Sequence, residues 1–219
     1  MVTKSIKFLN FKKKINIKKT KKDLNLILSE KNQVIQSLST GYKSSYKKKN
    51  LKKYKKYLNF RVIGMGGSTL GSQTIYNFLK KKIKKNFWFK DNLQINSKKI
   101  SNENLVNLVI SKSGNTIETI VNSNILIKKE NKNIFITENK KNYLHLLAQK
   151  LKAEIIHHNN YIGGRYSVLS EVGMVPADLM GLKSQNFRQL NLLIKNKKFI
   201  NSLIANVNST LFFIKNKKY

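Results

Sequence analysis

The sequence predicts an α/β protein: a three-layer α-β-α sandwich with a mostly parallel sheet and helical flanking segments. Between residues 58 and 182, short apolar segments alternate with helical patterns, which is typical of parallel strands joined by crossover helices. Hydrophobic residues make up 40% of the chain, enough to bury a core and to exclude a wholly disordered protein. Loops rich in Gly and Ser follow two of the predicted strands, where parallel sheets bind ligands.

The first 57 residues form a lysine-rich lead-in. Apolar residues at near-helical spacing predict one helix over residues 23–38 and a second, strongly basic helix over residues 47–58. We expect both helices to pack on the outside of the domain that follows.

The next segment, residues 58–182, is expected to be the ligand-binding domain. Its short runs of β-branched and aromatic residues predict strands, and the amphipathic stretches between them predict helices. The predicted strands cover residues 60–63, 87–90, 104–110, 134–137 and 153–157, and the helices cover residues 71–82, 116–129 and 143–151. The third segment, residues 183–219, is predicted to be helical over residues 187–194 and 199–213.

Composition excludes several classes of protein. The 219 residues include no Cys, which excludes disulfide frameworks and thiolate metal sites. No apolar run approaches the roughly 18 residues of a membrane span. Residues 1–22 are basic but lack the apolar stretch of a signal peptide, so secretion is not expected. We therefore expect a cytoplasmic protein without a membrane partner.

The net charge of +34 suggests a nucleic-acid partner at first sight, since 44 Lys and Arg face only 10 Asp and Glu. Only three of these 44 basic residues are Arg, however, and specific readers of phosphates and bases depend on Arg. Lys, Asn and Ile, which are all abundant here, are the residues that A/T-rich codons encode. We interpret the charge as compositional drift on a solvated surface, without a specific nucleic-acid partner. A polyanion-binding or nucleic-acid-binding protein stays the third hypothesis.

The first candidate loop, residues 64–71, has the sequence Gly-Met-Gly-Gly-Ser-Thr-Leu-Gly and joins a predicted strand to a helix. Glycines let the backbone approach an anion closely, and a helix N-terminus offers free N–H groups. The spacing is not that of the dinucleotide-binding motif, because Thr69 stands where that motif needs its third glycine. The loop also lacks the lysine of a P-loop. By itself it predicts either an anion-binding loop or a plain tight turn.

The second candidate loop, residues 111–116, has the sequence Ser-Lys-Ser-Gly-Asn-Thr and also precedes a predicted helix. Hydroxyl and amide groups at a helix N-terminus can hold a phosphate monoester, and Lys112 would add a positive charge. The alternative is that Ser113 or Thr116 only caps the helix. One cap does not require this many donors, so we favour the phosphate site.

The third candidate loop, residues 163–167, has the sequence Gly-Gly-Arg-Tyr-Ser and precedes an expected amphipathic helix. Arg165 is placed to reach over the end of the sheet, although a surface Arg in a turn is the alternative. Since Arg is so rare in this chain, its retention here suggests a geometric need. The adjacent His157 and His158 would point to opposite faces of a strand, so they cannot share one metal ion without distortion. We expect ordinary strand-end histidines and no metal site.

Together, the three loops resemble the phosphoglucose isomerase family, a member of the sugar-isomerase (SIS) superfamily. Residues 64–71 are similar to the family's Gly-Ile-Gly-Gly-Ser-x-Leu-Gly, residues 111–119 to its Ser-Lys-[Ser/Thr]-x-Thr-Thr-x-Glu-Thr, and residues 163–167 to its Gly-Gly-Arg-[Phe/Tyr]-Ser. The resemblance is strong over residues 60–181. It implies a flavodoxin-like SIS domain over residues 58–182 and the helical start of a second SIS domain over residues 183–219.

The resemblance implies a glycolytic and gluconeogenic enzyme, glucose-6-phosphate isomerase, which interconverts glucose 6-phosphate and fructose 6-phosphate by general acid–base proton transfer. Ser111, Ser113 and Thr116 would hold the sugar phosphate, with Lys112 beside it. The resemblance implies neither a metal nor an organic cofactor, and a homodimer for the full-length form.

The remaining implied site residues surround the sugar. Gly67, Ser68 and Gly164 would border the substrate. Arg165 would stabilise the enediolate that forms between C1 and C2, a role of the oxyanion-hole type. Glu118 would lie near the place where the base acts.

The chain departs from the family pattern in a few places. Asn115 replaces a usual Thr, and Glu171 stands where a small residue is common. Family members continue through a second SIS domain that carries the general-base Glu, a ring-opening His and a late Lys. We therefore expect this chain to carry the phosphate-binding half and to lack the general base. The alternative is a non-catalytic sugar-phosphate-binding SIS domain.

Overall fold

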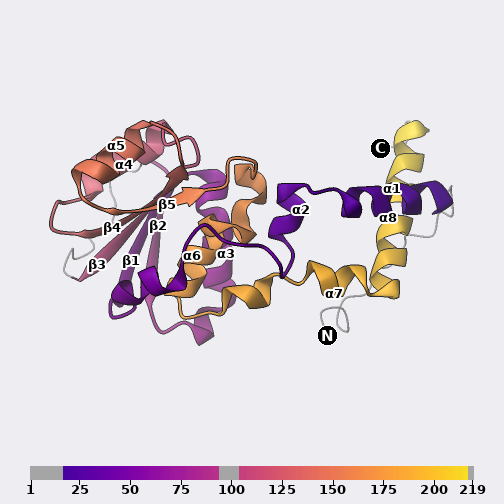
Figure 1. Ribbon diagram of the computed structural model, residues 1–219, viewed down its shortest axis with the longest axis horizontal. Helices are drawn as coiled ribbons and strands as arrows, with labels where there is room; N and C mark the ends of the chain where they lie inside the picture. The colour runs from indigo at the N-terminus through magenta and orange to yellow at the C-terminus, as the bar shows by residue number, and fades with distance from the viewer. Residues whose placement is uncertain (1–16, 94–103, 217–219) are drawn as a thin grey trace. The chain divides into compact units, whose positions relative to one another are not determined.

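The computed structural model describes residues 17–93 and 104–216, which fall into two compact units (Figure 1). One unit spans Lys43–Phe187 and contains the sheet. The other combines the described chain up to Tyr42 with the described chain from Arg188 onward.

The sheet of the larger unit has five strands, and each strand is parallel to its neighbours. The strands are β1 (Asn59–Gly64), β2 (Asn86–Lys90), β3 (Leu105–Ile110), β4 (Lys132–Glu138) and β5 (Glu154–His158). They are arranged in the order β2-β1-β3-β4-β5. The central strand β3 is buried along its whole length, as its uninterrupted apolar and amide sequence requires. This confirms the predicted α/β class with a parallel sheet.

Helices cover both faces of the sheet and complete the three layers (Figure 1). On one face, α4 (Ile117–Leu126) and α5 (Tyr143–Lys150) pack on a cluster that includes Ile63, Val109 and Phe135. On the other face lie α3 (Leu70–Phe78), α6 (Glu171–Leu179) and the 3₁₀ helix η1 (Lys48–Tyr54), over the larger of the two hydrophobic clusters. Successive strand residues point to opposite faces, so β1, β3, β4 and β5 supply both clusters, whereas β2 supplies the larger one.

Arg61 fastens α4 to the sheet. Its guanidinium is buried beside the end of that helix and donates a hydrogen bond to the carbonyl oxygen of Leu126 at 2.9 Å. Burial lowers the pKa of Arg61 below its usual value because desolvation disfavours the charged form. A cation at a helix C-terminus is favoured by the helix dipole, which explains why a charged residue is tolerated inside this strand.

Three predicted helices differ from the structure. The helix expected over residues 23–38 is two helices, α1 (Ile17–Ser29) and α2 (Gln33–Ser37), because the Asn32 side chain accepts from the Val34 N–H and starts a new helix. The helix expected over residues 47–58 is the short η1, which ends where the chain turns into β1. Finally, α6 is not amphipathic, since all nine of its residues are buried.

The lead-in explains why α6 is buried on every side. The Ser45 N–H donates to Glu171 Oε1 at 2.9 Å, and the Tyr46 hydroxyl donates to Asp178 Oδ2 at 2.7 Å. Lys48 Nζ lies 3.4 Å from Asp178 Oδ1. The two carboxylates that give α6 the sequence of a half-exposed helix therefore bind the segment that covers it.

Short 3₁₀ helices follow or precede several elements of the larger unit. They are η2 (Gly66–Ser68), η3 (Lys80–Lys82), η4 (Gly164–Leu169) and η5 (Ser184–Phe187). Because η3 replaces its last turn, α3 ends four residues before the predicted limit; α4 also ends three residues before its predicted limit.

The smaller unit is helical and contains α1, α2, α7 (Leu190–Ile194) and α8 (Lys197–Lys215). The Thr20 hydroxyl of α1 donates to Asn208 Oδ1 of α8, and Ile204 of α8 is buried. Arg188, which is also buried, lies over the Tyr42 ring with its Cζ 4.9 Å from the ring centroid. In the portion of the chain that the structure describes, no helix has both the length and the apolar character needed to cross a membrane.

We predict that Asn142 is a strong local determinant of stability. Its Oδ1 accepts from the His145 N–H at 2.8 Å as the N-cap of α5, and its Nδ2 donates to Thr137 Oγ1 at 3.2 Å and to the Lys140 carbonyl at 3.0 Å. Asn142→Ala should lower the free energy of unfolding by about 0.5–2 kcal/mol, the usual effect of losing a cap.

Urea denaturation followed by circular dichroism measures this effect. The matched control is Asn139→Ala, because Asn139 is a nearby exposed asparagine. Equal midpoints for the two variants would show that the Asn142 bonds do not stabilise the fold.

Candidate functional site

The three loops that the sequence singled out lie at the carboxyl ends of β1, β3 and β5, the end of a parallel sheet where ligands bind. The loop after β1 includes η2, the loop after β3 leads into α4, and the chain after β5 leads through η4 into α6. Because β5 is an outer strand, its loop must run back across the sheet to reach the loop after β1.

The loops after β1 and β5 meet through their backbones at two glycines. A Cβ atom placed on Gly67 would overlap the carbonyl oxygen of Gly164 and would lie 3.2 Å from the Arg165 nitrogen. The Ser167 hydroxyl donates to the Gly164 carbonyl at 2.7 Å and lies 3.4 Å from the Gly67 carbonyl oxygen. This contact puts the Arg165 backbone directly beside the glycine-rich loop.

Two further glycines support η4, the helix that carries Arg165. A Cβ on Gly71 of α3 would lie 2.6 Å from Val168 Cγ2, and a Cβ on Gly173 of α6 would overlap the Val168 carbonyl oxygen. Glycines from three elements therefore surround η4, and its position follows from close backbone packing. The Arg165 side chain is exposed on the outer side of η4.

The loop after β3 is shaped from inside by Ser111. This side chain is buried, its hydroxyl accepts from the Gly114 N–H at 3.2 Å, and it is hydrogen-bonded to the Thr116 hydroxyl at 2.9 Å. Gly114 has a φ of 67°, a left-handed conformation that favours glycine. Ser113 is exposed, and its hydroxyl accepts from the Asn115 N–H at 3.3 Å, which leaves its own O–H to donate to a ligand.

The first turn of α4 begins directly after this loop. Thr116 holds the N-cap position, but its side chain makes no capping hydrogen bond to the helix, since its hydroxyl is turned to Ser111. Glu118 is half-buried in the first turn, where the helix dipole favours a carboxylate. The N-terminus of α4 therefore keeps its positive end available to an anion.

The loop after β3 also docks onto the start of α5. Asn115 Oδ1 accepts from the Tyr143 N–H at 3.1 Å, and the Gly114 carbonyl accepts from the Leu144 N–H at 3.1 Å. A Cβ on Gly114 would overlap the Asn142 side chain. Asn115, which departs from the family pattern, thus holds the loop in place. Asn142 was missed in the sequence, although an Asn before an apolar helical pattern is a recognisable N-cap signal.

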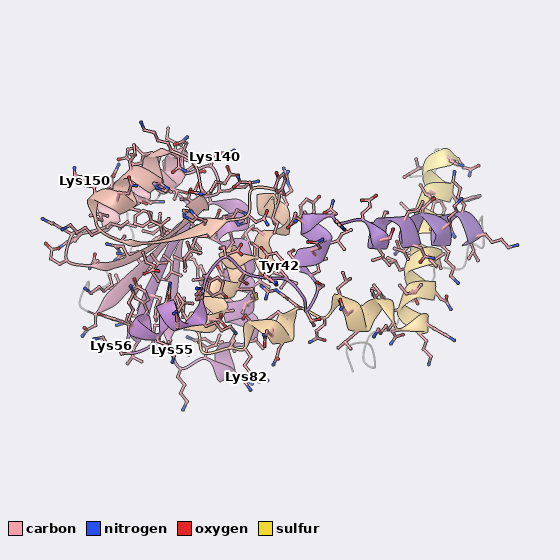
Figure 2. The ribbon with its side chains drawn as sticks, viewed as in Figure 1. Tyr42, Lys55, Lys56, Lys82, Lys140 and Lys150 are labelled. Atoms are coloured by element: carbon pink, nitrogen blue, oxygen red, sulfur yellow. The ribbon has the colours of Figure 1, made fainter. Side chains whose placement is uncertain are left out.

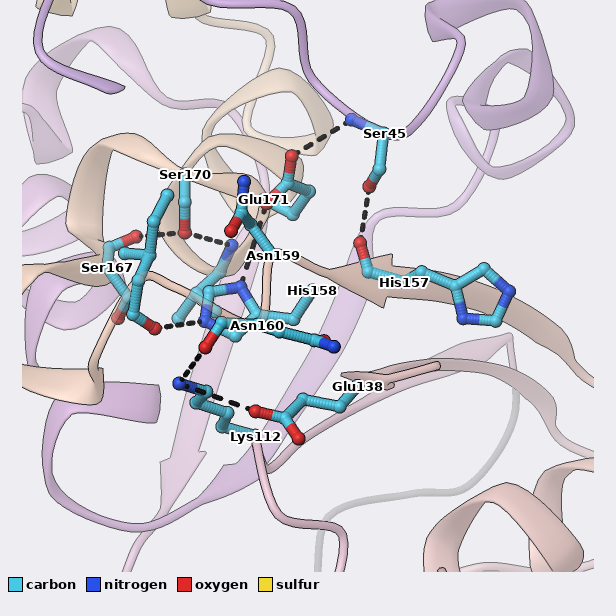
Figure 3. A network of polar contacts seen from close by, with 12 residues as sticks. Ser45, Lys112, Glu138, His157, His158, Asn159, Asn160, Ser167, Ser170 and Glu171 are labelled. Atoms are coloured by element: carbon cyan, nitrogen blue, oxygen red, sulfur yellow. Dashed lines mark hydrogen bonds and ion pairs between the residues drawn. The ribbon is translucent and has the colours of Figure 1, made fainter. Parts of the chain in front are cut away.

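Lys112 links the loop after β3 to the loop after β5 (Figure 3). Its ammonium group donates to the Asn160 carbonyl at 2.6 Å and lies 3.4 Å from Glu138 Oε1. The Lys112 charge is therefore held between two loops and is partly balanced by Glu138, which also binds Lys140 at 3.3 Å. The sequence placed this lysine beside the phosphate but gave no signal for its partners.

A buried pair of side chains closes the segment that carries Arg165 (Figure 3). His158, at the end of β5, has its Nε2 3.0 Å from the Ile162 carbonyl oxygen, which can only accept a hydrogen bond. Its Nδ1 lies 3.6 Å from Glu171 Oε2, and both side chains are about 1% exposed. His158 precedes the segment and Glu171 follows it, so the pair fixes both of its ends. Among the described residues, no three His, Asp or Glu side chains gather as a possible metal site.

The fold and the three loops together define a sugar-isomerase (SIS) domain. The domain architecture resembles that of a hypothetical protein from Thermus thermophilus (TM-score 0.63, 18% identity, covering 77% of this chain and 45% of the other). It also resembles tagatose-6-phosphate ketose/aldose isomerase from Escherichia coli (TM-score 0.52, 16% identity, covering 72% and 49%).

Within this class, the chain belongs to the phosphoglucose isomerase family, whose model matches residues 12–206. Glucose-6-phosphate isomerase from Methanocaldococcus jannaschii is 36% identical over 158 residues, covering 65% of this chain and 38% of that protein. The enzyme of the same name from Acholeplasma laidlawii is 36% identical over 140 residues, covering 55% and 33%. The chain thus spans about a third of the length of these relatives, and the family predicted from the three loops is confirmed.

We predict that the two facing glycines respond differently to a methyl group. Gly67→Ala would force the loop after β1 away from Gly164, whereas nothing lies within 4 Å of a Cβ on Gly164. Gly67→Ala should therefore lower the free energy of unfolding by about 1–3 kcal/mol, as overpacking does. Gly164→Ala should leave it nearly unchanged.

Thermal unfolding of both variants followed by calorimetry checks this prediction. Equal losses of stability in the two variants would mean that the loops are not in close contact.

Proposed function

We propose that this chain carries the sugar-phosphate-binding part of a glucose-6-phosphate isomerase, the enzyme that interconverts glucose 6-phosphate and fructose 6-phosphate. The observation that carries the proposal is the backbone contact of Gly67 with Gly164, because it sets Arg165 beside the glycine-rich loop at the end of the sheet where α4 begins. A cation and an anion-binding helix N-terminus at one end of a sheet suit a ligand that carries a phosphate and develops a second negative charge.

For the phosphate, we assign direct contacts to the Ser113 hydroxyl, to Thr116 and to the N–H groups of the first turn of α4. The exposure of Ser113 and the uncapped start of α4 support this assignment. Ser111 would act mainly by holding the loop in shape, since its hydroxyl is engaged inside it. Lys112 would contribute positive electrostatic potential to the phosphate site while it links the two loops.

For the reaction, Arg165 would stabilise the enediolate oxygen as charge develops. The other two arginines of the chain, Arg61 and Arg188, are buried against structural partners, whereas Arg165 is exposed. Its retention in a chain otherwise dominated by lysine therefore calls for a role outside the core. Gly67, Ser68 and Gly164 would border the sugar, and the backbone contact at Gly67 supports this placement.

Arg165 cannot remove the C2 proton, because a guanidinium stays protonated at any ordinary pH. Glu171 is bound to His158 and to Ser45, which leaves Glu118 as the carboxylate nearest to the loop after β3 in the sequence. We propose that Glu118 supports the site and that the general base comes from outside these 219 residues. The second candidate function, a non-catalytic sugar-phosphate-binding domain, is favoured by the same engagement of Glu171.

The phosphate assignment predicts that Ser113→Ala and Thr116→Ala each weaken the binding of fructose 6-phosphate. Each variant loses a donor to a charged group, which should cost about 1–3 kcal/mol of binding free energy. Titration calorimetry at moderate salt measures the affinities. The control is Thr74→Ala, because Thr74 is exposed and its hydroxyl bonds only within α3, to the Leu70 carbonyl. Unchanged affinity in both loop variants would remove this loop from the site.

The catalytic assignment predicts that the purified 219-residue chain binds fructose 6-phosphate without isomerising it. Adding the second SIS domain of a relative, covalently or in trans, should produce glucose 6-phosphate in a dehydrogenase-coupled assay. That activity should fall roughly 10²–10³-fold in Arg165→Gln, as it does when an oxyanion donor is removed.

The Arg165→Gln chain, purified in the same way, also controls for contaminating host enzyme. Rapid turnover by the 219-residue chain alone would mean that a base has been overlooked, and Glu118→Gln would be the next variant. Binding that never leads to turnover with any second domain would favour the non-catalytic alternative.

A further inference from the structure

A hollow of about 550 Å³ lies at the opposite end of the sheet, where β4 and β5 begin. Its walls come from η1, from the turn before β4 and from the turn before β5. Five lysines and two glutamates give its lining a net charge of +3. The residues that matter for the argument are Lys53, Lys56, Tyr57, Lys129, Lys132 and Lys152.

Helix dipoles account for only part of this charge. Both α4 and α5 end near the starts of β4 and β5, and lysines after a helix end are stabilised by its negative pole. That pole is equivalent to about half a charge, which is less than the full charge of each lysine. Moreover, Lys53 and Lys56 come from η1 and the turn after it. Because lysines outnumber glutamates on its concave lining, the hollow stays positive.

Lys152 closes the C-terminus of α5: its N–H donates to the Gln149 carbonyl at 3.0 Å, and the Ala153 N–H donates to the Ala148 carbonyl at 2.9 Å. The φ of Lys152 is 49°, in the left-handed region where Gly and Asn are favoured and other side chains are strained. Asn is abundant in this chain, so a relaxed residue for this turn was readily accessible. A lysine at this position therefore adds a charge to the wall of the hollow, where the backbone alone would favour Gly or Asn.

Neighbouring side chains contact two of the other lysines, Lys53 and Lys56. Lys53 Nζ lies 2.7 Å from Glu154 Oε2, and this hydrogen bond raises the pKa of Lys53, so its charge is secure. Lys56 Nζ lies 5.6 Å from the centroid of the half-buried Tyr57 ring. A lysine ammonium group acts as a point charge and does not impose the bidentate geometry of an arginine guanidinium. Several lysines therefore suit a flexible chain of phosphates better than a single carboxylate held in one orientation.

We propose that this hollow binds a small ligand with a chain of three or more phosphates, such as the triphosphate of a nucleotide or inorganic tripolyphosphate. Its volume lies within the roughly 300–1,000 Å³ that small-molecule sites occupy. Five lysines from three separate segments converge on it, more than one phosphate monoester could engage. The site is separate from the loops assigned to the sugar phosphate, which lie at the other end of the sheet, and it does not depend on that assignment.

Titration calorimetry of the 219-residue chain with ATP and with inorganic tripolyphosphate, at roughly physiological salt, tests the proposal. The test variant is the double substitution Lys56→Gln and Lys152→Asn, in which Asn also relieves the strained turn. The matched control is Lys55→Gln and Lys150→Gln, because both lysines are exposed sequence neighbours that do not line the hollow (Figure 2).

The affinity of the test variant for both ligands should be roughly tenfold lower or more, since each lost charge removes an ion pair worth severalfold in affinity. The control should change either affinity less than twofold, and binding should have a stoichiometry of one ligand per chain. Fructose 6-phosphate should not displace ATP. Tyr57→Leu distinguishes the two sources of phosphate. If the adenine base stacks on the Tyr57 ring, this variant should bind ATP more weakly and tripolyphosphate with unchanged affinity. If the phosphates alone are recognised, the affinity for both ligands should stay unchanged.

Three results would overturn the proposal. An equal loss of affinity in the control and test variants would show that the ligands are attracted to the basic surface as a whole. Displacement of ATP by fructose 6-phosphate would place ATP in the loops at the other end of the sheet. Binding of a single-stranded oligonucleotide through Lys56 and Lys152, without binding of ATP or tripolyphosphate, would identify a nucleic-acid surface instead.

Discussion

The arrangement of the site depends on close backbone packing around η4. Gly67, Gly71 and Gly173 come from three different elements, and each lacks the side chain that would collide with η4. Since Arg165 belongs to η4, its position follows from contacts that no surface residue can alter. The surface of this chain is unusually rich in lysine. The geometry of the site can stay defined on such a surface, because it depends on close contacts at glycines and not on exposed side chains.

Buried polar pairs add a second level of order. His158 and Glu171 are removed from water, as is Asp178, and such groups are costly unless they are bonded. Here Glu171 accepts from the Ser45 N–H and lies 3.6 Å from His158 Nδ1, His158 Nε2 is hydrogen-bonded to the Ile162 carbonyl, and Asp178 accepts from the Tyr46 hydroxyl. These bonds add little net stability over apolar packing. They determine which segment covers α6 and where the segment that carries Arg165 begins and ends.

The sequence predicted the sheet, the order of its elements and the positions of the three loops, because strands rich in β-branched residues and glycine loops have strong local signals. Long-range contacts could not be predicted. The residue types do not distinguish the buried Ser111 from the exposed Ser113, since the difference arises from the turn that continues through the left-handed Gly114. The Asn160 carbonyl that binds Lys112 has no side-chain signature at all. The amphipathic prediction for α6 was wrong because the partners of its two carboxylates lie in the lead-in.

The bonds between the lead-in and α6 also govern how this domain can be made. Ser45 and Glu171 are 126 positions apart, and Tyr46 and Asp178 are 132 apart. During synthesis, the basic segment around Ser45 leaves the ribosome long before either partner exists, and it must remain unpaired while the whole sheet is translated. The contacts made by the first residues of the domain are therefore among the last that can form, and α6 is covered only after the rest of the domain has been made.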